Sequence, residues 1–127
     1  DPACLQSFWS RITEEEGVLY LSTNVRFRSN DAYKAAFMNI FALTQLQITL
    51  AARISERCGR EVRLGRYTHL ADSYHLYGSS FDEYQARFVK GLEERSFEER
   101  TLRYSDMREI MEEARPQILQ KVEAMRR

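Results

Sequence analysis

The residues most able to do chemistry form a short polar run, Arg28-Ser29-Asn30-Asp31, which follows a strand-like segment and precedes a long apolar helix. Asn39 lies early in that helix, and a second polar group, His75-Leu76-Tyr77, follows further along the chain. A guanidinium, a hydroxyl, a carboxylate, a carboxamide, an imidazole and a phenol together provide charge-assisted and directional hydrogen bonds. These residue types predict a site for a phosphorylated, hydrogen-bonding small molecule such as a nucleotide.

Length and composition are typical of one soluble globular domain. Of 127 residues, 43% are hydrophobic and 30% are charged, and 19 basic residues balance 19 acidic ones. A chain of this length buries roughly two thirds of its unfolded surface, so we expect one core over residues 1–127. A formal net charge of zero does not favour a general nucleic-acid surface, whereas a small anion needs only a local arginine. We therefore expect no nucleic-acid partner.

A charge-free stretch at residues 35–52 raises a membrane span as an alternative to a buried helix. Five polar residues argue against the membrane, because each is costly in lipid but can find a partner inside protein. They are Asn39, Thr44, Gln45, Gln47 and Thr49. The first seven residues have neither the basic flank nor the apolar stretch of a signal peptide. These features favour a cytoplasmic protein without membrane contact.

Cysteine and histidine are scarce. Cys4 and Cys58 are the two cysteines, there are two histidines, and there is no CxxC pair. We therefore expect neither a disulfide scaffold nor a structural zinc site.

The first half of the chain predicts a hairpin followed by a helix. Strands are expected over residues 4–11 and 17–28, separated by the acidic turn at residues 14–17. The second strand alternates, with Leu19, Leu21, Thr23, Val25 and Phe27 on one face and Tyr20, Ser22, Asn24, Arg26 and Arg28 on the other. Residues 29–31 provide N-cap chemistry for a helix over about 32–57, which ends at Gly59. Because this helix is apolar around most of its circumference, we expect it to be central and buried.

The second half predicts a further strand and then helices. Residues 61–77 read as extended, and in an uninterrupted strand Ser73, His75 and Tyr77 would share a face. Residues 78–80 precede a helix that reaches about residue 95. One or two further helices are expected over 98–127, the last beginning at Pro116, because proline is tolerated in a first turn.

Five motifs, taken in order, resemble the thymidylate synthase family and its relatives that hydroxymethylate pyrimidine nucleotides. They are Pro2-Ala3-Cys4-Leu5-Gln6, Arg28-Ser29-Asn30-Asp31, Ala36-Phe37-Met38-Asn39, Gly65-Arg66-Tyr67 and Asp72-Ser73-Tyr74-His75-Leu76-Tyr77. They cover about residues 2–78 and match the C-terminal half of such an enzyme, which contains the catalytic cysteine. The resemblance implies an α+β fold, in which a thymidylate synthase-like mixed sheet packs against a long central buried helix. It also implies a homodimer formed through that sheet, with residues 79–127 as a helical extension.

The resemblance gives Cys4 the role of the nucleophile that adds to C6 of the pyrimidine, so that C5 becomes a carbon nucleophile. A free thiol has a pKa of about 8.5, and nearby arginine charge favours the reactive thiolate. Arg28 would bind the nucleotide phosphate in a bidentate manner, with the Ser29 hydroxyl in the same phosphate cradle. Without the resemblance, Cys4 is also compatible with a packed small hydrophobe, Arg28 with a surface arginine and Ser29 with a helix cap.

The resemblance assigns the remaining substrate-binding residues to the base and the sugar. Asn39 matches an asparagine that accepts from N3–H of uracil and donates to O4, which favours dUMP over dCMP; family members that act on cytosine often carry aspartate. His75 and Tyr77 match the pair that bonds the deoxyribose 3′-hydroxyl, whereas His69 matches no residue with a role. Asp31 lies among groups that order the pyrimidine and the folate, or supports the helix N-terminus electrostatically. Taken alone, Asn39, His75 and Tyr77 also fit satisfied structural residues.

The chain departs from the family around these motifs. No segment matches the half that precedes the cysteine, which in the family supplies a proton-transferring glutamate and further phosphate-binding arginines. Leu5 stands where many synthases have histidine, Ala3 separates Pro2 from Cys4, and the chain ends with the basic residues 126–127 rather than an apolar tail. We expect the C-terminal half of a longer enzyme, or a short homologue without full catalysis.

Two classes of function stay open. One is dTMP biosynthesis by methylation of dUMP, with 5,10-methylenetetrahydrofolate as co-substrate and Cys4 as covalent nucleophile. Hydroxymethylation of dUMP or dCMP shares the first step and is the alternative within this class. The other class is a non-catalytic domain for nucleotide binding or assembly.

Overall fold

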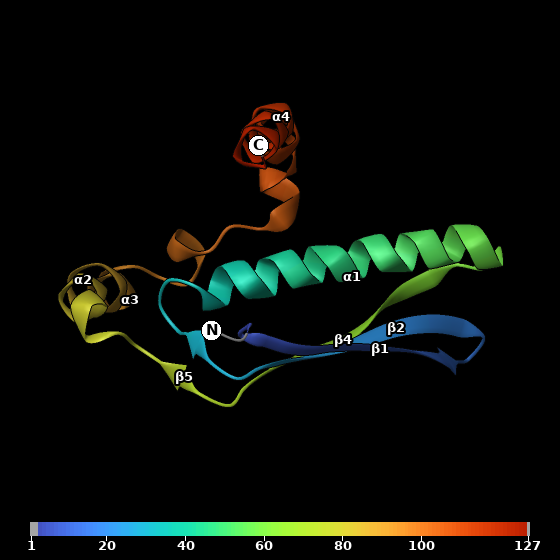
Figure 1. Ribbon diagram of the computed structural model, residues 1–127, viewed down its shortest axis with the longest axis horizontal. Helices are drawn as coiled ribbons and strands as arrows, with labels where there is room; N and C mark the ends of the chain where they lie inside the picture. The colour runs from blue at the N-terminus through green and yellow to red at the C-terminus, as the bar shows by residue number, and fades with distance from the viewer. Residues whose placement is uncertain (1–2, 127) are drawn as a thin grey trace. The chain divides into compact units, whose positions relative to one another are not determined.

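The computed structural model describes residues 3–126, so Pro2 of the first motif lies outside the described residues. The chain is α+β and forms two compact units, Asp1–Phe81 and Asp82–Arg127 (Figure 1). All the motifs that carry the resemblance belong to the first unit.

The first unit is built on a mixed three-stranded sheet in the order β1-β2-β4. β1 (Leu5–Glu15) and β2 (Val18–Phe27) form the predicted antiparallel hairpin, and β4 (Val62–Ala71) pairs with β2 in parallel. β1 runs beyond the predicted residue 11 because the hairpin turn is tight. Glu16 and Gly17 both have positive φ angles, 51° and 81°, which suit a two-residue turn with the twist of the flanking strands.

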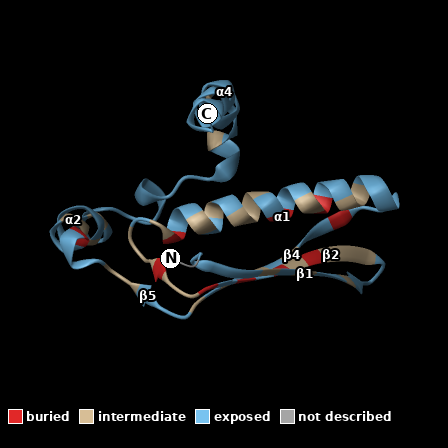
Figure 2. Ribbon diagram, in the orientation of Figure 1, coloured by how far each residue is buried: buried red, intermediate tan, exposed pale blue. Residues whose placement is uncertain are grey.

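The predicted alternation of β2 is confirmed. Leu21, Thr23, Val25 and Phe27 are buried beneath the helix, where the core of the unit lies (Figure 2). Thr23 has no exposed surface, and its hydroxyl shares a hydrogen bond of 3.1 Å with Ser10 on β1. The core face therefore tolerates a polar residue where a neighbouring strand satisfies it.

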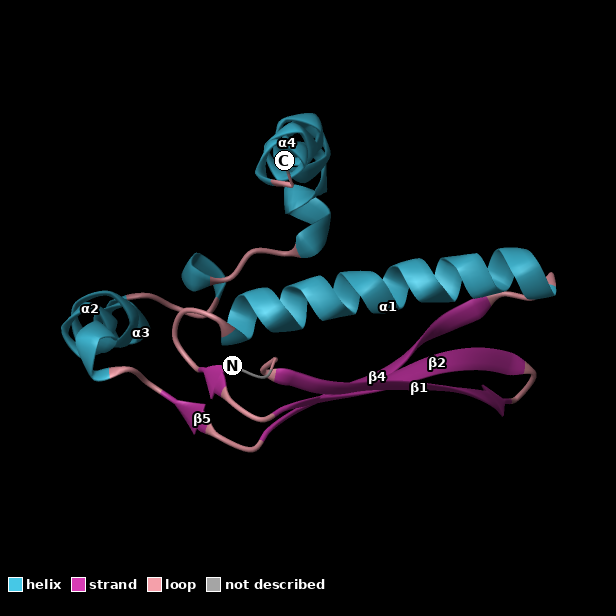
Figure 3. Cartoon of the chain, viewed as in Figure 1, coloured by secondary structure: helices cyan, strands magenta, loops and turns pink. Residues whose placement is uncertain are grey.

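α1 (Ala36–Cys58) connects β2 to β4 and covers one face of the sheet (Figure 3). Its predicted end is confirmed, since Gly59 takes the left-handed conformation at φ 69°. Its start is later than predicted. Asp31 Oδ1 accepts from the Tyr33 and Lys34 N–H groups at 2.9 and 3.3 Å, so the carboxylate orders the turns over 32–35, and Ala35 is the N-cap.

The prediction that α1 is buried around its circumference is wrong for the described residues. Only the face toward the sheet is buried, at Ala36, Gln47 and Ala51. Phe37 and Met38 are 70% and 59% exposed on another face. The uncharged stretch therefore has one packed face rather than several, and no helix among residues 3–126 combines the length and apolarity needed to cross a membrane.

A β-bulge in β4 is held in place by side chains from β2 and α1. Leu21 pairs with Leu64 but Thr23 pairs with Tyr67, so β4 carries one extra residue near Gly65. A Cβ on Gly65 would collide with the Ser22 hydroxyl and lie 3.0 Å from the Leu21 carbonyl. The Arg66 N–H donates to Ser22 Oγ at 3.1 Å, and Gln47 Nε2 donates to the Leu21 carbonyl at 2.7 Å. Side chains thus provide hydrogen bonds for backbone groups where the bulge interrupts the β2–β4 ladder.

The second unit is helical. Its helices follow from α2 (Phe81–Glu83), which begins at the last residue of the first unit. They continue as a π-helical segment (Tyr84–Val89), α3 (Lys90–Glu94), a 3-10 turn (Glu98–Arg100) and α4 (Tyr104–Met125). The prediction that the last helix begins at Pro116 is wrong, because Pro116 lies inside α4. The helix begins where Arg103 leaves an extended conformation and Asp106 enters the first turn, and acidic residues are favoured at that end.

The buried Gln47 amide predicts a measurable stability difference within α1. Gln47→Leu leaves the Leu21 carbonyl at the bulge without its donor, and we expect a loss of about 1–3 kcal/mol in the free energy of unfolding. Thr49→Val is the matched control, because the exposed Thr49 hydroxyl donates to the Gln45 carbonyl of its own helix, where water can replace it. Urea denaturation measures both variants, and equal stability would contradict the role assigned to Gln47.

Candidate functional site

Two polar motifs meet where the parallel strands end. β3 (Asn30–Asp31) and β5 (Tyr74–His75) form a parallel ladder in which Asn30 pairs with Tyr74 and Asp31 with His75. This ladder keeps the register of the β2–β4 pairing, in which Phe27 pairs with Ala71. Ligands of open sheets with parallel strands commonly bind beyond the carboxyl ends of those strands. The pairing therefore places both motifs together at the expected end of the sheet.

Backbone hydrogen bonds also join the chain segments that lie between the β2–β4 ladder and the β3–β5 ladder. The Asp72 N–H donates to the Phe27 carbonyl at 2.9 Å, and the Asn30 N–H donates to the Ser73 carbonyl at 2.8 Å. Beside them, the Arg26 guanidinium contacts the Asp72 carboxylate through Nε and Nη2, each at 3.1 Å. These contacts fix the position of the polar run relative to β5.

Cys4 lies at the same end of the hairpin as the polar run. Its carbonyl accepts from the Arg28 N–H at 2.9 Å, which brings the start of β1 beside the end of β2. The Cys4 side chain is exposed, and Arg28 and Ser29 are half-buried. The structure therefore brings the predicted nucleophile next to the predicted phosphate-binding residues along the backbone.

His75 and Tyr77 lie side by side, although the strand that carries them is not continuous. The chain bends at Asp72 and Ser73 between β4 and β5, so the extended residues 61–77 do not form the single uninterrupted strand in which these side chains would share a face. The rings of His75 and Tyr77 still meet edge to face, with centroids 4.8 Å apart. Ser73 Oγ lies 3.4 Å from His75 Nδ1. The three side chains predicted to share a face are thus neighbours.

Asn39 is joined to this region through a set of side chains that sequence reasoning missed. Asn39 Nδ2 donates to Asn30 Oδ1 at 3.0 Å, and Asn30 Nδ2 lies 2.8 Å from His69 Nε2. His69 Nδ1 lies 3.0 Å from the Tyr67 hydroxyl. We call these four residues, Asn39, Asn30, His69 and Tyr67, the amide–imidazole network. Asn30 is only 3% exposed.

The bulge explains why the sequence pattern did not reveal the network. Val62 faces the core at the start of β4, and regular alternation from Val62 would put Tyr67 and His69 on the opposite face. The extra residue near Gly65 reverses this parity, so that Tyr67 and His69 pair with the core residues Thr23 and Val25. A glycine inside a strand pattern is the signal that could have indicated the reversal.

Burial shifts the pKa values of two members of the network. Removal from water lowers the pKa of His69, because the imidazolium loses hydration, and raises the pKa of Tyr67, because the phenolate does. The His69 ring also stacks on Phe27, with centroids 4.9 Å apart. The loss of hydration favours a neutral imidazole in the folded protein.

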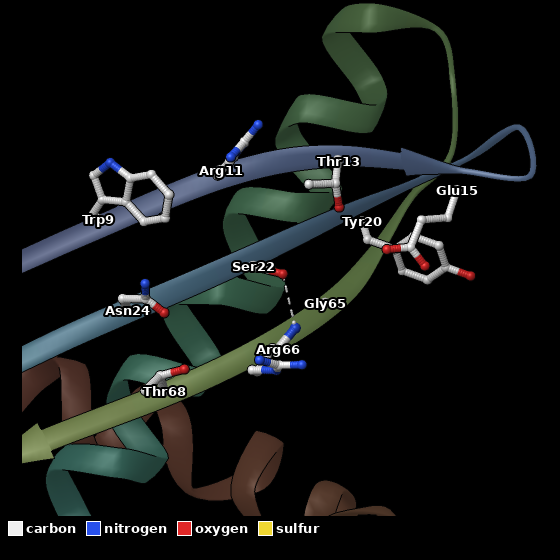
Figure 4. Close-up of a pocket in the computed structure, with 10 residues that line it drawn as sticks. All are labelled: Trp9, Arg11, Thr13, Glu15, Tyr20, Ser22, Asn24, Gly65, Arg66 and Thr68. Carbon is white, nitrogen blue, oxygen red and sulfur yellow. Dashed lines mark hydrogen bonds between the residues drawn. The ribbon is translucent and has the colours of Figure 1, made fainter.

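Several hollows lie on the surface of the first unit. One of about 400 Å³ lies beside the free edge of β4 and is lined by Ile40, His69, Leu70, Ala71 and Tyr74. Another, of about 580 Å³, lies on the sheet face away from α1 (Figure 4) and is lined by Trp9, Arg11, Thr13, Glu15, Tyr20, Ser22, Asn24, Gly65, Arg66 and Thr68. The second hollow contains none of the predicted site residues. The first shares His69 with the network, so it is the hollow that belongs with the candidate site.

The candidate site thus combines an exposed thiol, an arginine, a serine hydroxyl, a bonded carboxamide and an imidazole–phenol pair at one end of the sheet. Such a set can bind an anion, read the hydrogen-bonding edge of a base and provide a nucleophile. Comparison of the chain with known protein families, with curated proteins and with solved structures finds no match. The resemblance to thymidylate synthases therefore rests on the sequence motifs alone.

The lowered pKa of His69 predicts a pH dependence of stability. Because the folded pKa lies below the ordinary value of about 6.5, the neutral ring favours folding above pH 6.5, and this contribution is lost as the pH falls through the folded pKa. We expect the free energy of unfolding to fall between pH 7.5 and 5.5, and to fall less in His69→Gln. Denaturation at each pH tests this, and an NMR titration of the His69 ring with a pKa at or above 6.5 would contradict it.

Proposed function

We propose that this chain is the cysteine-containing half of a thymidylate synthase-like enzyme that methylates dUMP to dTMP with 5,10-methylenetetrahydrofolate as co-substrate. The proposal includes a thymidylate synthase-like fold for the first unit and a cytoplasmic location. One observation carries it: residues from motifs up to 73 positions apart, from Cys4 to Tyr77, are joined at one end of the sheet by backbone pairing and by the ring contact between His75 and Tyr77.

Each predicted residue has a position compatible with its proposed role. Arg28, with Ser29 beside it, would bind the nucleotide phosphate next to Cys4, and Asn39 would read the base from the first turn of α1. His75 and Tyr77 would bond the 3′-hydroxyl of the sugar as an adjacent pair. Asp31 already orders the turn before α1 through two backbone N–H groups, and its second carboxylate oxygen would face the pyrimidine or folate.

The proposed chemistry begins with the Cys4 thiolate. Its sulfur forms a bond to C6 of uracil, and the C5–C6 electron pair moves toward C5 and the O4 carbonyl. C5 then forms a bond to the methylene carbon supplied by the folate. After water takes the C5 proton and the folate nitrogen leaves, the folate would transfer hydride to the exocyclic methylene, giving methyl and dihydrofolate. The sulfur would then depart from C6 as the C5–C6 double bond re-forms.

Hydroxymethylation is the alternative within the same chemistry, because water rather than hydride would then capture the exocyclic methylene. Asn39 favours a uracil substrate in either reaction, since the carboxamide offers an acceptor for N3–H and a donor for O4. A non-catalytic domain would bind the nucleotide without forming the sulfur–carbon bond.

We also propose a homodimer in which the outer face of the sheet is the contact surface. This face carries Trp9, which is 53% exposed, together with Arg11, Arg66 and, further along β1, Glu15 (Figure 4). Exposed tryptophan and arginine residues are enriched at protein interfaces. The face also lies opposite the α1-covered core, so a second copy there would leave the candidate site accessible.

Nucleotide binding predicts stabilisation of the chain by dUMP. A ligand at about one hundred times its dissociation constant raises the free energy of unfolding by roughly 2.7 kcal/mol, which a thermal-shift titration detects. We expect Arg28→Ala to lose most of this stabilisation and Asn39→Asp to redirect it toward dCMP. Arg63→Ala is the control, because Arg63 is an exposed arginine of β4 paired with Glu61. A failure of dUMP, at millimolar concentration, to stabilise the unaltered chain would overturn the nucleotide site.

Covalent chemistry predicts an adduct that is specific to one of the two exposed cysteines. With 5-fluoro-dUMP and methylenetetrahydrofolate, C5 carries fluorine instead of a removable proton, so the sulfur–carbon bond should persist. We expect intact mass spectrometry to show the adduct in the unaltered chain and in Cys58→Ser, but not in Cys4→Ser. Stabilisation by dUMP without any adduct would instead favour the non-catalytic alternative.

A further inference from the structure

The amide–imidazole network couples the proposed base-reading residue to the core through groups that the proposed chemistry does not use. Its three hydrogen bonds join α1, β3 and β4, at 3.0 Å for Asn39 to Asn30, 2.8 Å for Asn30 to His69 and 3.0 Å for His69 to Tyr67. Asn30, in the middle, is 3% exposed. Water therefore has little access to replace either of its partners.

Hydrogen-bond polarity makes the orientation of each member depend on the next. A carboxamide has one accepting and one donating end, and a neutral imidazole has one accepting and one donating nitrogen. The Asn30 oxygen accepts from Asn39, so the Asn30 NH₂ group faces His69. His69 Nε2 must then accept, which places the ring proton on Nδ1, directed at the Tyr67 oxygen.

We propose that Asn30 and His69 are positioning residues that hold the Asn39 carboxamide with its nitrogen toward Asn30, and that they thereby select uracil over cytosine. Turning Asn39 round would place its oxygen against the Asn30 oxygen. With Asn39 turned round, the hydrogen bonds of the network could form only if Asn30 also turned and His69 carried its proton on Nε2. The orientation of one half-buried carboxamide is thus set by two residues that would not touch the ligand.

Base selection follows from the complementary edges of the two pyrimidines. Uracil presents a donor at N3–H and an acceptor at O4, whereas cytosine presents an acceptor at N3 and a donor at its 4-amino group. With one N–H used by Asn30, Asn39 retains its oxygen and a second N–H. These atoms complement uracil in the observed orientation and cytosine only in the reversed one. This consequence rests on the proposed function, whereas the orientation itself is a property of the ligand-free protein.

A pair of substitutions at Asn30 tests the base selection. Asn30→Leu removes the acceptor for Asn39, and we expect the ratio of the dCMP to the dUMP dissociation constant to fall roughly tenfold. Asn30→Asp keeps an oxygen for Asn39 and should retain the ratio, with His69 now donating from Nε2. Thr68→Val, on the outer face of β4, is the control. Equal weakening of both nucleotides in Asn30→Leu would show a merely structural role and overturn the proposal.

A second measurement needs neither a variant nor a nucleotide. Long-range proton–nitrogen NMR correlations of the unaltered chain at pH 8 should show His69 protonated at Nδ1 and unprotonated at Nε2. Protonation at Nε2 would overturn the proposed orientation of Asn39. If neither nucleotide binds, the proposed function and the selection of uracil both fail, while the His69 spectrum still decides whether Asn39 is held as described.

Discussion

The parallel pairing of β2 with β4 is the constraint on which the rest of the first unit depends. Two parallel strands require a long crossover, and α1 provides it while covering the core face of the same two strands. Because the register continues unchanged into β3 and β5, residues near position 30 must lie beside residues near position 74. The placement of the polar motifs therefore follows from strand register, and the Arg26–Asp72 ion pair adds a side-chain contact to it.

The bulge near Gly65 changes which side chains of β4 lie on the core face of the sheet. One extra residue in β4 reverses its alternation, so His69 lies on the core side and reaches Asn30. At the bulge, the Leu21 carbonyl accepts a hydrogen bond from Gln47, and the Arg66 N–H donates one to Ser22. A side chain in the middle of α1 thus supports the irregularity that places an imidazole near the end of the sheet. Fold and site are linked through a single irregular pairing.

Local patterns predicted the elements well, and the reasons for the failures are physical. Alternation along β2 and the glycine at the end of α1 depend on neighbours in sequence, and both were predictable. The bend at Asp72 and the partners of Asn30 depend on strands far apart in sequence, and no local pattern contains that information. The apolar circumference of α1 predicted more burial than the described residues provide, since Phe37 and Met38 remain exposed. For the candidate site, the order of motifs provided the proposed residues, and the structure showed which partners hold Asn39.

The energetics of the network bear on why it is present. A buried carboxamide such as Asn30 is costly unless its donor and acceptor are both satisfied, and here both are. Even when satisfied, such a pair adds little net stability, because replacing both partners with apolar groups of similar shape can be nearly neutral. What apolar side chains cannot reproduce is direction, since each hydrogen bond in a connected network fixes the polarity of the next. Directional control of Asn39 is therefore a property that this arrangement has and a purely hydrophobic core at the same position would lack.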